Sequence, residues 1–328
     1  MDFLKLCEQL SLGQPITAPV PLQGGFLHRM FRLTTPSGDY AVKLLNPHVM
    51  TRSTANDNFR QAEALEHKLE QTNLPILPAL SFGGEKMQQV DGQYLYLFPY
   101  YGGAALTDET ITPTHCQKVG GILAAIHGVE RRTAPCQRDP IAVDWDDYLR
   151  RTAHLPEIHT ELQAARDILY DLQQKGNAAL PHLPAEQAIC HNDMDPKNVL
   201  WQGQDCRVID LECLGYDSPY LELLETALCW AGYESGQVDH PRLTAFLRGY
   251  AAGGGVLPTV WEPLVDANVS RLEWLGYNLD RVLGIGCDPH EQAIGRTEVG
   301  KTLRCLTGYA RDKQNILTTL YNISKDMA

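Results

Sequence analysis

Residues 190–212 decide how the rest of the chain is interpreted. They begin with Cys190-His191-Asn192-Asp193-Met194-Asp195-Pro196-Lys197-Asn198-Val199-Leu200 and, after a turn at Gln202-Gly203, end with Val208-Ile209-Asp210-Leu211-Glu212. The first part is mostly polar, whereas apolar residues flank the turn. We therefore expect a polar loop, a short strand, a turn and a second strand that ends in a carboxylate.

The spacing His-x-Asp-x-x-x-x-Asn, followed later by an Asp after two apolar residues, suits one kind of chemistry. Asp193 can accept the proton of an attacking hydroxyl group. Asn198 and Asp210 offer oxygen atoms, which are the ligands that Mg²⁺ prefers. We predict that Asp193 is the catalytic base and that Asn198 and Asp210 hold Mg²⁺ on the triphosphate of ATP. Glu212 is a further candidate ligand.

The same residues carry a resemblance to a known family. The Cys190–Asp193 opening and the Ile209-Asp210-x-Glu212 strand resemble the catalytic loop of the aminoglycoside phosphotransferase and choline kinase family, within the protein-kinase-like superfamily. The resemblance implies an α+β, protein-kinase-like bilobal fold. A small antiparallel-sheet N-lobe with one main helix would cover residues 1–99, and a larger, mostly helical C-lobe would cover residues 100–328. The hinge would lie at about residues 98–103.

Composition agrees with a globular protein of this size. The chain has 328 residues, of which 44% are hydrophobic and 21% charged, so it can form two substantial units. Its nine cysteines show no Cys-x-x-Cys pair, which favours reduced thiols in a cytoplasm. A net charge of −12 disfavours nucleic-acid binding and is compatible with a cationic substrate. No signal peptide, transmembrane helix or membrane partner is expected, and the oligomeric state stays open.

The first hundred residues read as strands and one main helix. Runs between residues 20 and 98, with a hairpin at Asp91-Gly92, predict a five-stranded antiparallel sheet, and residues 56–71 predict the helix. Lys43 lies in an apolar strand, where an unpaired charge is costly. The resemblance implies that Lys43 binds the α- and β-phosphates of ATP and that Glu63, on the helix, orients it.

Two further segments are candidates for nucleotide binding. Gly24 and Gly25 are expected to form a turn whose backbone N–H groups can approach phosphate, although most such pairs are ordinary turns. Phe98 and Tyr100 lie in the segment that the resemblance assigns to the hinge, where backbone groups would meet the base. We expect ATP as the nucleotide, with GTP as an open alternative.

The remainder of the chain is predicted to be helical. Expected helices cover residues 114–127, 144–151, 157–176, 220–225 onward, 241–251, 259–283 and 291–320. Trp274 and Tyr277 are candidate substrate contacts, because aromatic faces suit ammonium groups, but aromatic residues at helical spacing are usually core. Asp195 is a third candidate. It stands where Ser/Thr protein kinases have Lys, which favours a small-molecule acceptor over a protein.

The predicted function is therefore ATP- and Mg²⁺-dependent phosphate transfer to a hydroxyl of a small molecule. An aminoglycoside-like antibiotic, choline or another amino alcohol, and a sugar all remain open as acceptors. The alternatives are a catalytically silent nucleotide-binding module, a protein kinase and a metal hydrolase. Intact Asp193, Asn198, Asp210 and Lys43 oppose a silent module. The lack of Asp-Phe-Gly and Ala-Pro-Glu opposes a protein kinase, and the lack of a second His at ligand spacing opposes a hydrolase.

Overall fold

The chain forms two compact units, each built from separate parts of the sequence. The computed structural model describes residues 1–22, 28–135 and 137–327. The first unit combines Met1–Thr107 with His191–Gly215, and the second combines Asp108–Cys190 with Tyr216–Ala328. The segment that carries the predicted catalytic loop is therefore part of the same unit as the N-terminal sheet.

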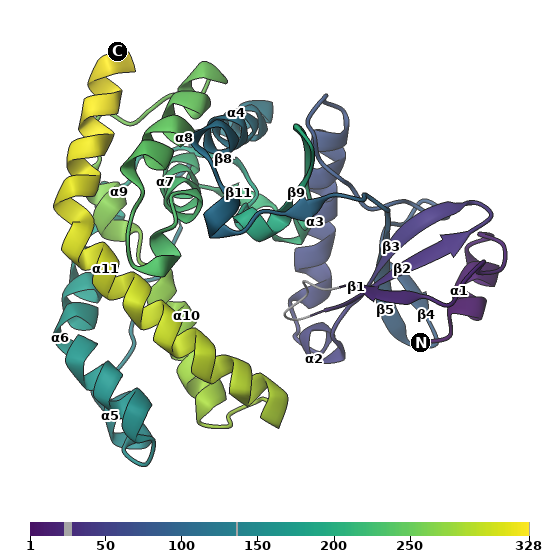
Figure 1. Cartoon of the computed structure of the whole chain (residues 1–328), viewed down its shortest axis with the longest axis horizontal. Helices are drawn as coiled ribbons and strands as arrows, with labels where there is room; N and C mark the ends of the chain where they lie inside the picture. Colours follow the sequence, from purple (N-terminus) through teal and green to yellow (C-terminus); the bar gives the residue numbers. More distant parts are fainter. Residues whose placement is uncertain (23–27, 136, 328) are drawn as a thin grey trace. The chain divides into compact units, whose positions relative to one another are not determined.

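An antiparallel sheet forms the centre of the first unit, as predicted. Its strand order is β1-β2-β3-β5-β4, and Figure 1 shows its strands in purple and blue. Leucine and valine side chains on one face pack against helix α1, which Asp2 caps at its N-terminus. The bounds are β1 Val20–Leu22, β2 Arg29–Thr35, β3 Gly38–Leu44, β4 Gln88–Val90, β5 Gln93–Pro99 and α1 Phe3–Gln9.

The β4–β5 turn confirms the hairpin predicted at Asp91-Gly92. Both residues have positive φ angles, 49° at Asp91 and 80° at Gly92, which a type I′ turn requires at its two central positions. The pairing of Val90 with Gln93 closes this two-residue turn. The register of β4 and β5 therefore follows from local turn chemistry.

Helix α3, Ala55–Glu70, is the main helix predicted for this unit. It follows the short helix α2, Pro47–Met50. Phe59 on α3 packs against Tyr96 of β5, with ring centroids 5.9 Å apart. Glu66 and Glu70 both pair with the buried Lys86, at 2.9 and 2.7 Å. These contacts attach α3 to the sheet and leave Glu63 near the middle of the helix.

Residues 191–215 add a small second sheet to the first unit, in the order β10-β9-β6. Its strands are β6 Ala104–Ala105, β9 Val199–Gln202 and β10 Asp205–Val208. The second strand was predicted to continue to the carboxylates, and this detail is wrong. β10 ends at Val208, because Asp210 takes the left-handed conformation and Leu211–Cys213 form a 3₁₀ turn.

The second unit is mainly helical, as predicted, and Figure 1 shows its helices in blue, teal, green and yellow. A short sheet, β11-β8-β7, joins them. The helices are α4 Pro113–Val129, α5 Trp145–Thr152, α6 Pro156–Ala179, α7 Pro219–Trp230, α8 His240–Ala252, α9 Glu262–Ala267, α10 Arg271–Val282 and α11 Pro289–Met327. The strands are β7 Arg131–Arg132, β8 Gln187–Cys190 and β11 Gly215–Asp217.

Two helix predictions need correction. The stretch 259–283 is not one helix, because Asn268 has φ −78° and ψ 65° and separates α9 from α10. Helix α11 extends to Met327, seven residues beyond the predicted end at Leu320. Its buried residues include Ile316, Leu320 and Ile323, so the apolar stripe continues to the C-terminus. Among the described residues, no helix is both long and apolar enough to cross a membrane.

Candidate active site

The loop after β8 places the carboxylate of Asp193 between a cation and an amide. Lys197 Nζ donates to Asp193 Oδ1 at 2.9 Å, and Asn198 Nδ2 donates to Asp193 Oδ2 at 2.8 Å. Asn198 Nδ2 also donates to the Asp193 carbonyl, at 2.8 Å. The 3₁₀ turn Pro196–Asn198 brings these side chains round to the carboxylate. Hydrogen bonds to both carboxylate oxygens therefore orient the Asp193 side chain.

His191 and Asn192 fix this loop through hydrogen bonds to the backbone of residues 209–213. His191 Nδ1 accepts from the Asp193 N–H at 3.2 Å, which leaves Nε2 to donate to the Ile209 carbonyl at 3.0 Å. Asn192 has φ 63° and donates to the Cys213 carbonyl at 2.9 Å. Left-handed backbone at residues other than glycine is uncommon and often occurs at functional sites. His191 thus serves the loop as a structural residue and is fully buried.

The electrostatic surroundings of Asp193 suit proton transfer. Burial and the nearby charge of Asp195 raise the pKa of Asp193, while the ammonium of Lys197 opposes that change. Asp195 itself pairs with Lys197 at 3.4 Å. A carboxylate with a raised pKa is a better proton acceptor than an ordinary one. The charges around Asp193 therefore fit the predicted role of a base.

Lys43 lies on β3 with its ammonium between two carboxylates of the same unit. Its Nζ donates to Asp210 Oδ1 at 2.6 Å and to Glu212 Oε2 at 2.5 Å. The side chain is buried, so the ammonium depends on these partners. Although burial alone would lower the pKa of Lys43, the two carboxylates raise it. Lys43 is thus a buried cation directly beside a predicted metal ligand.

The expected ion pair between Lys43 and Glu63 is not the one that the structure shows. Glu63 instead accepts a hydrogen bond from the Tyr96 hydroxyl at 2.7 Å. Tyr96 is the residue opposite Lys43 in the β3–β5 pairing, and its ring packs against Phe59 of α3. The partners of Lys43 within the described chain come from residues 210–212. Glu63 nevertheless lines the same small cavity as Lys43, of about 20 Å³.

Glu212 contacts two nitrogen-bearing side chains of the first unit, Lys43 and His28. His28 Nδ1 accepts from the Asn46 N–H at 2.9 Å, so its Nε2 carries the hydrogen that faces Glu212 Oε1 at 3.2 Å. Burial would raise the pKa of Glu212, but the His28 hydrogen bond and the Lys43 charge lower it to about 2. Sequence reasoning missed His28. Its position three residues after Gly25, close to the segment predicted to bind phosphate, was the available signal.

The remaining oxygen donors fit a Mg²⁺ ion. Asn198 uses its amide nitrogen on Asp193, which leaves its amide oxygen for a cation. The Ile209 N–H donates to the Asn198 carbonyl at 2.9 Å, which couples this residue to the turn that carries Asp210. An amide oxygen and a carboxylate form the donor set that Mg²⁺ takes together with phosphates and water. Asn198 and Asp210 are therefore compatible with the predicted ion.

The predicted nucleotide contacts are only partly described. Gly24 and Gly25 lie outside the described residues. Phe98 is on β5 and lines the cavity beside Lys43. The Tyr100 N–H donates to the Asp39 carbonyl at 2.9 Å, so this amide faces β3 and is used within the sheet. Phe98 and Tyr100 thus stay predictions for side-chain or neighbouring backbone contacts.

The predicted substrate residues of α10 lie on the surface of the second unit. Trp274 and Tyr277 are 36% and 39% exposed and stack on each other, with ring centroids 5.5 Å apart. They are therefore not core residues, which was the alternative interpretation. Asn278, on the same helix, is fully buried. A role for the two aromatic side chains in acceptor binding stays a prediction.

A buried polar network in the second unit supports the strand that leads into the loop. His127 Nε2 pairs with Glu222 Oε2 at 2.7 Å, and His127 Nδ1 bonds with the Tyr250 hydroxyl at 2.9 Å. Cys190, the last residue of β8, lies 3.8 Å from His127 Nε2. Glu222 lies on α7 and is buried. The structure shows that it anchors His127 of α4 to α7.

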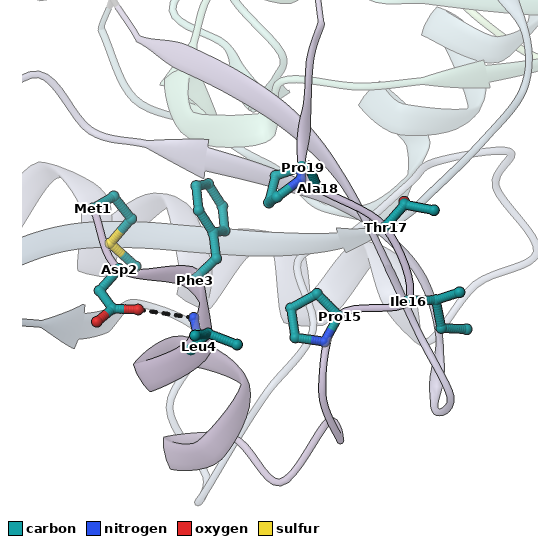
Figure 2. A pocket seen from close by; sticks show the side chains of 9 residues that line it. All are labelled: Met1, Asp2, Phe3, Leu4, Pro15, Ile16, Thr17, Ala18 and Pro19. Atoms are coloured by element: carbon teal, nitrogen blue, oxygen red, sulfur yellow. Dashed lines mark hydrogen bonds between the residues drawn. The ribbon is translucent and has the colours of Figure 1, made fainter.

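A second hollow lies on the N-terminal side of the first unit, far from these residues in sequence. Figure 2 shows the side chains that line it, which come from residues 1–4 and 15–19 and are mostly apolar. Its volume is about 580 Å³. The only carboxylate there, Asp2, accepts the Leu4 N–H at 3.0 Å and so caps α1. This hollow has no group suited to catalysis among its lining residues.

Comparison with known proteins identifies the class. A model of the phosphotransferase enzyme family, APH, matches residues 19–264, which is most of the chain. The chain therefore belongs to this family, and it is a phosphotransferase enzyme with a kinase-like α+β fold. The predicted family, fold class and kind of enzyme are confirmed. None of the curated protein sequences matches it significantly.

Solved structures share the fold at low sequence identity. Spectinomycin phosphotransferase APH(9)-Ia, in complex with ADP and spectinomycin, has 12% identity and a TM-score of 0.63, with 99% of this chain and 98% of that chain covered. The amicoumacin kinase hAmiN, with AMP-PNP and Ca²⁺, has 13% identity and a TM-score of 0.59, covering 92% and 93%. A choline/ethanolamine kinase family protein from Mesorhizobium loti has 18% identity and a TM-score of 0.52, covering 92% and 97%.

Proposed function

We propose that the protein transfers the γ-phosphate of ATP, with Mg²⁺, to a hydroxyl group of a small molecule. One observation carries the proposal: Asp193, Asn198, Asp210 and Lys43 belong to one compact unit, and each has the surroundings that its role needs. Asp193 is an oriented carboxylate, Asn198 and Asp210 supply oxygen atoms, and Lys43 is a buried cation beside Asp210.

In the proposed mechanism, Asp193 positions the acceptor hydroxyl and takes its proton as the new bond to phosphorus forms. Lys197 and Asn198 keep the two carboxylate oxygens in place. Lys43 binds the phosphates of the nucleotide, and Asn198 and Asp210 hold the metal. Mg²⁺ would neutralise negative charge on the transferring phosphate. His191 keeps the loop closed on Ile209 and does not transfer protons itself.

The strand β5 supports the proposal that the base binds at residues 98–101. The Tyr100 N–H bonds to β3, and the Leu97 carbonyl accepts from Leu80 on the opposite edge, at 2.7 Å. Backbone groups of successive strand residues point to opposite edges. The Pro99 carbonyl and the Tyr101 N–H would therefore face away from β3. An acceptor followed two residues later by a donor complements the N6 amino group and N1 of adenine.

The acceptor is proposed to be a small, hydroxylated compound, with a cationic one favoured. Related folds include enzymes named for spectinomycin, amicoumacin, and choline or ethanolamine. The acidic net charge of −12 and the carboxylate of Asp195 beside Asp193 agree with a cationic acceptor. The Trp274–Tyr277 pair would offer aromatic faces to an ammonium group. Antibiotics, amino alcohols and sugars are all candidates.

The other parts of the proposal concern organisation and location. We retain an N-lobe of residues 1–99, a C-lobe of residues 100–328 and a hinge at about 98–103. All cysteines in the described part of the chain are free thiols, which supports a cytoplasmic location. Neither nucleic acid nor a membrane is proposed as a partner.

The test is phosphate transfer from [γ-³²P]ATP to a panel of amino alcohols, sugars and aminoglycosides, with Mg²⁺. Replacement of Asp193 with Asn keeps the shape of the side chain and removes the base, so we expect a loss of turnover of at least about 100-fold. Nucleotide binding, measured by calorimetry, should remain.

The exposed Asp167→Asn variant is the control. Full turnover in Asp193→Asn would reject Asp193 as the base, and no transfer to any acceptor would favour the silent module.

A further inference from the structure

Lys197 brings a positive charge directly beside the predicted base. Its Nζ lies 2.9 Å from Asp193 Oδ1 and 3.4 Å from Asp195 Oδ2, so one ammonium contacts two carboxylates. A lysine ammonium carries three N–H donors, and within the described chain these two carboxylates are its hydrogen-bond partners. The side chain is 51% exposed, so its end is accessible. One donor of Lys197 is therefore available to a ligand that binds at the loop.

The other basic side chain of the same segment is turned to a different task. Within residues 191–215, all of which the structure describes, Lys and Arg occur at positions 197 and 207. Arg207 donates to the Cys206 carbonyl at 2.8 Å, and its guanidinium lies 5.6 Å from the centre of the Tyr101 ring. Lys197 is thus the basic residue of this segment that contacts Asp193.

The position of Lys197 relative to the base limits its distance from the reacting atoms. A base must come within about 3 Å of the hydroxyl oxygen whose proton it accepts. Because Lys197 Nζ is 2.9 Å from Asp193 Oδ1, the attacking oxygen would lie within about 6 Å of this ammonium. The transferring phosphate approaches that same oxygen. A lysine has a flexible four-carbon stem, so a small shift brings Nζ to a phosphate oxygen.

The charge of the loop gives a reason for such a contact. Asp193 and Asp195 place two negative charges beside one ammonium, and phosphate transfer brings a further anion to the same place. Like charges at close range repel each other. An ammonium that contacts both the base and the phosphate reduces this repulsion, and it stabilises negative charge where the reaction moves it.

We propose that Lys197 is a second catalytic residue, whose ammonium contacts the γ-phosphate of bound ATP and keeps this contact during transfer. The acceptor oxygen forms the new bond to phosphorus as the bond from phosphorus to the β–γ bridging oxygen breaks. The acceptor proton passes to Asp193, the electron pair of the broken bond stays on ADP, and Lys197 stays protonated throughout. The inference rests on the proposed function and adds a phosphate contact to the orienting contact with Asp193.

The test compares two nucleotides that differ in the γ-phosphate. Calorimetry with Mg²⁺ gives the Kd of AMP-PNP, which carries a γ-phosphate, and of ADP, which lacks it. Lys197→Met should weaken AMP-PNP binding about tenfold, as expected for the loss of a charge-assisted hydrogen bond, and leave ADP binding unchanged. Lys197→Arg keeps the charge and should restore most of the affinity. A lysine that only orients the base predicts no change with either nucleotide.

The matched control is Lys175→Met on α6. Lys175 is 54% exposed and pairs with Asp171, four residues earlier, at 2.7 Å, as Lys197 pairs with Asp193. Its replacement should change neither Kd.

A charge-compensated variant separates a direct contact from the general field of the loop. Asp195→Asn combined with Lys197→Met has the same net charge as the wild type. A direct contact predicts that AMP-PNP binding stays about tenfold weaker in this double variant, whereas a field effect predicts recovery.

The kinetic readout is kcat in the phosphate-transfer assay. Lys197→Met should lower kcat about 100-fold, the usual loss for one donor to the charge that develops in a transition state. Equal changes in the two Kd values, no change in either, recovery in the double variant, or full kcat in Lys197→Met overturns the inference and leaves the proposed function intact. A wild type that binds neither nucleotide overturns both.

Discussion

At the scale of one residue, Glu212 shows how the first unit brings polar and charged side chains together. Two side chains that are distant in sequence, His28 and Lys43, approach one carboxylate. Burial alone would raise the pKa of Glu212, yet these two partners lower it to about 2. The ionised form of Glu212 is therefore favoured by folding, and this preference can be measured without any ligand.

A pH prediction follows for the free energy of unfolding. A carboxyl group whose pKa falls on folding, here from 4.5 to about 2, stabilises the protein above the unfolded pKa. That contribution is lost as the pH falls from about 4.5 through 2. The free energy of unfolding of the wild type should exceed that of Glu212→Gln by about 3 kcal/mol at pH 7, and the difference should shrink as the pH approaches 2. Urea unfolding at a series of pH values measures it.

An unchanged difference between pH 7 and pH 2.5 would contradict this assignment. Glu85→Gln, at an exposed position, is the control and should show no such trend. Because both variants keep the size of the side chain, the comparison reports charge and hydrogen bonding alone.

At the scale of elements, the crossing of α4 and α8 depends on two glycines. A Cβ atom at Gly120 would lie 2.1 Å from the Phe246 carbonyl oxygen, and one at Gly249 would lie 1.9 Å from the Gln117 carbonyl oxygen. The backbones of α4 and α8 are therefore in direct contact at this crossing. The helix α4 also carries His127 near its end, so its position bears on the buried polar network that His127 forms with Glu222.

Gly120→Ala should destabilise the protein, because the methyl group forces the two helices apart; we expect a loss of about 2 kcal/mol or more. Gly128 lies on the exposed side of the same helix and has nothing within 4 Å of its Cβ position. Gly128→Ala should instead be neutral or stabilise by up to about 1 kcal/mol. Chemical denaturation of both variants gives the comparison. Equal stability of the two would mean that the helices do not cross this closely.

At the scale of the molecule, the candidate site belongs to a unit that is built from two separate segments of the chain. Residues 1–107 supply Lys43, His28 and Glu63, and residues 191–215 supply Asp193, Asn198 and Asp210. A ligand that binds both segments should stabilise the folded state, since binding to the native form alone shifts the unfolding equilibrium.

AMP-PNP with Mg²⁺ should therefore raise the melting temperature. At a ligand concentration about 100 times the Kd, the added stability is about 2.7 kcal/mol. Chelation of Mg²⁺ with EDTA should reduce the shift, and Lys43→Met should remove most of it. Differential scanning fluorimetry measures each condition. A shift in Lys43→Met equal to that of the wild type would exclude Lys43 from the nucleotide site.

Much of the fold could be predicted from local patterns. The Asp91-Gly92 turn, the five-stranded sheet and the long helices were visible because alternation, helical periodicity and turn residues act over a few positions. The errors occurred where backbone departs from the pattern. The left-handed Asp210 ends a strand early, and Asn268 divides a predicted helix. Neither conformation has a signal strong enough in the sequence alone.

The sequence by itself determined the family and the class of reaction, and it predicted the catalytic-loop residues, because the spacing from Asp193 to Asn198 and Asp210 is a property of the chain. Tertiary structure alone decided which carboxylate meets Lys43. Glu63 is near it in sequence, whereas Glu212 is 169 residues away and still lies 2.5 Å from its ammonium. Pairing of buried charges depends on distance and on competing partners such as Tyr96 and His28, and the folded chain alone brings these together.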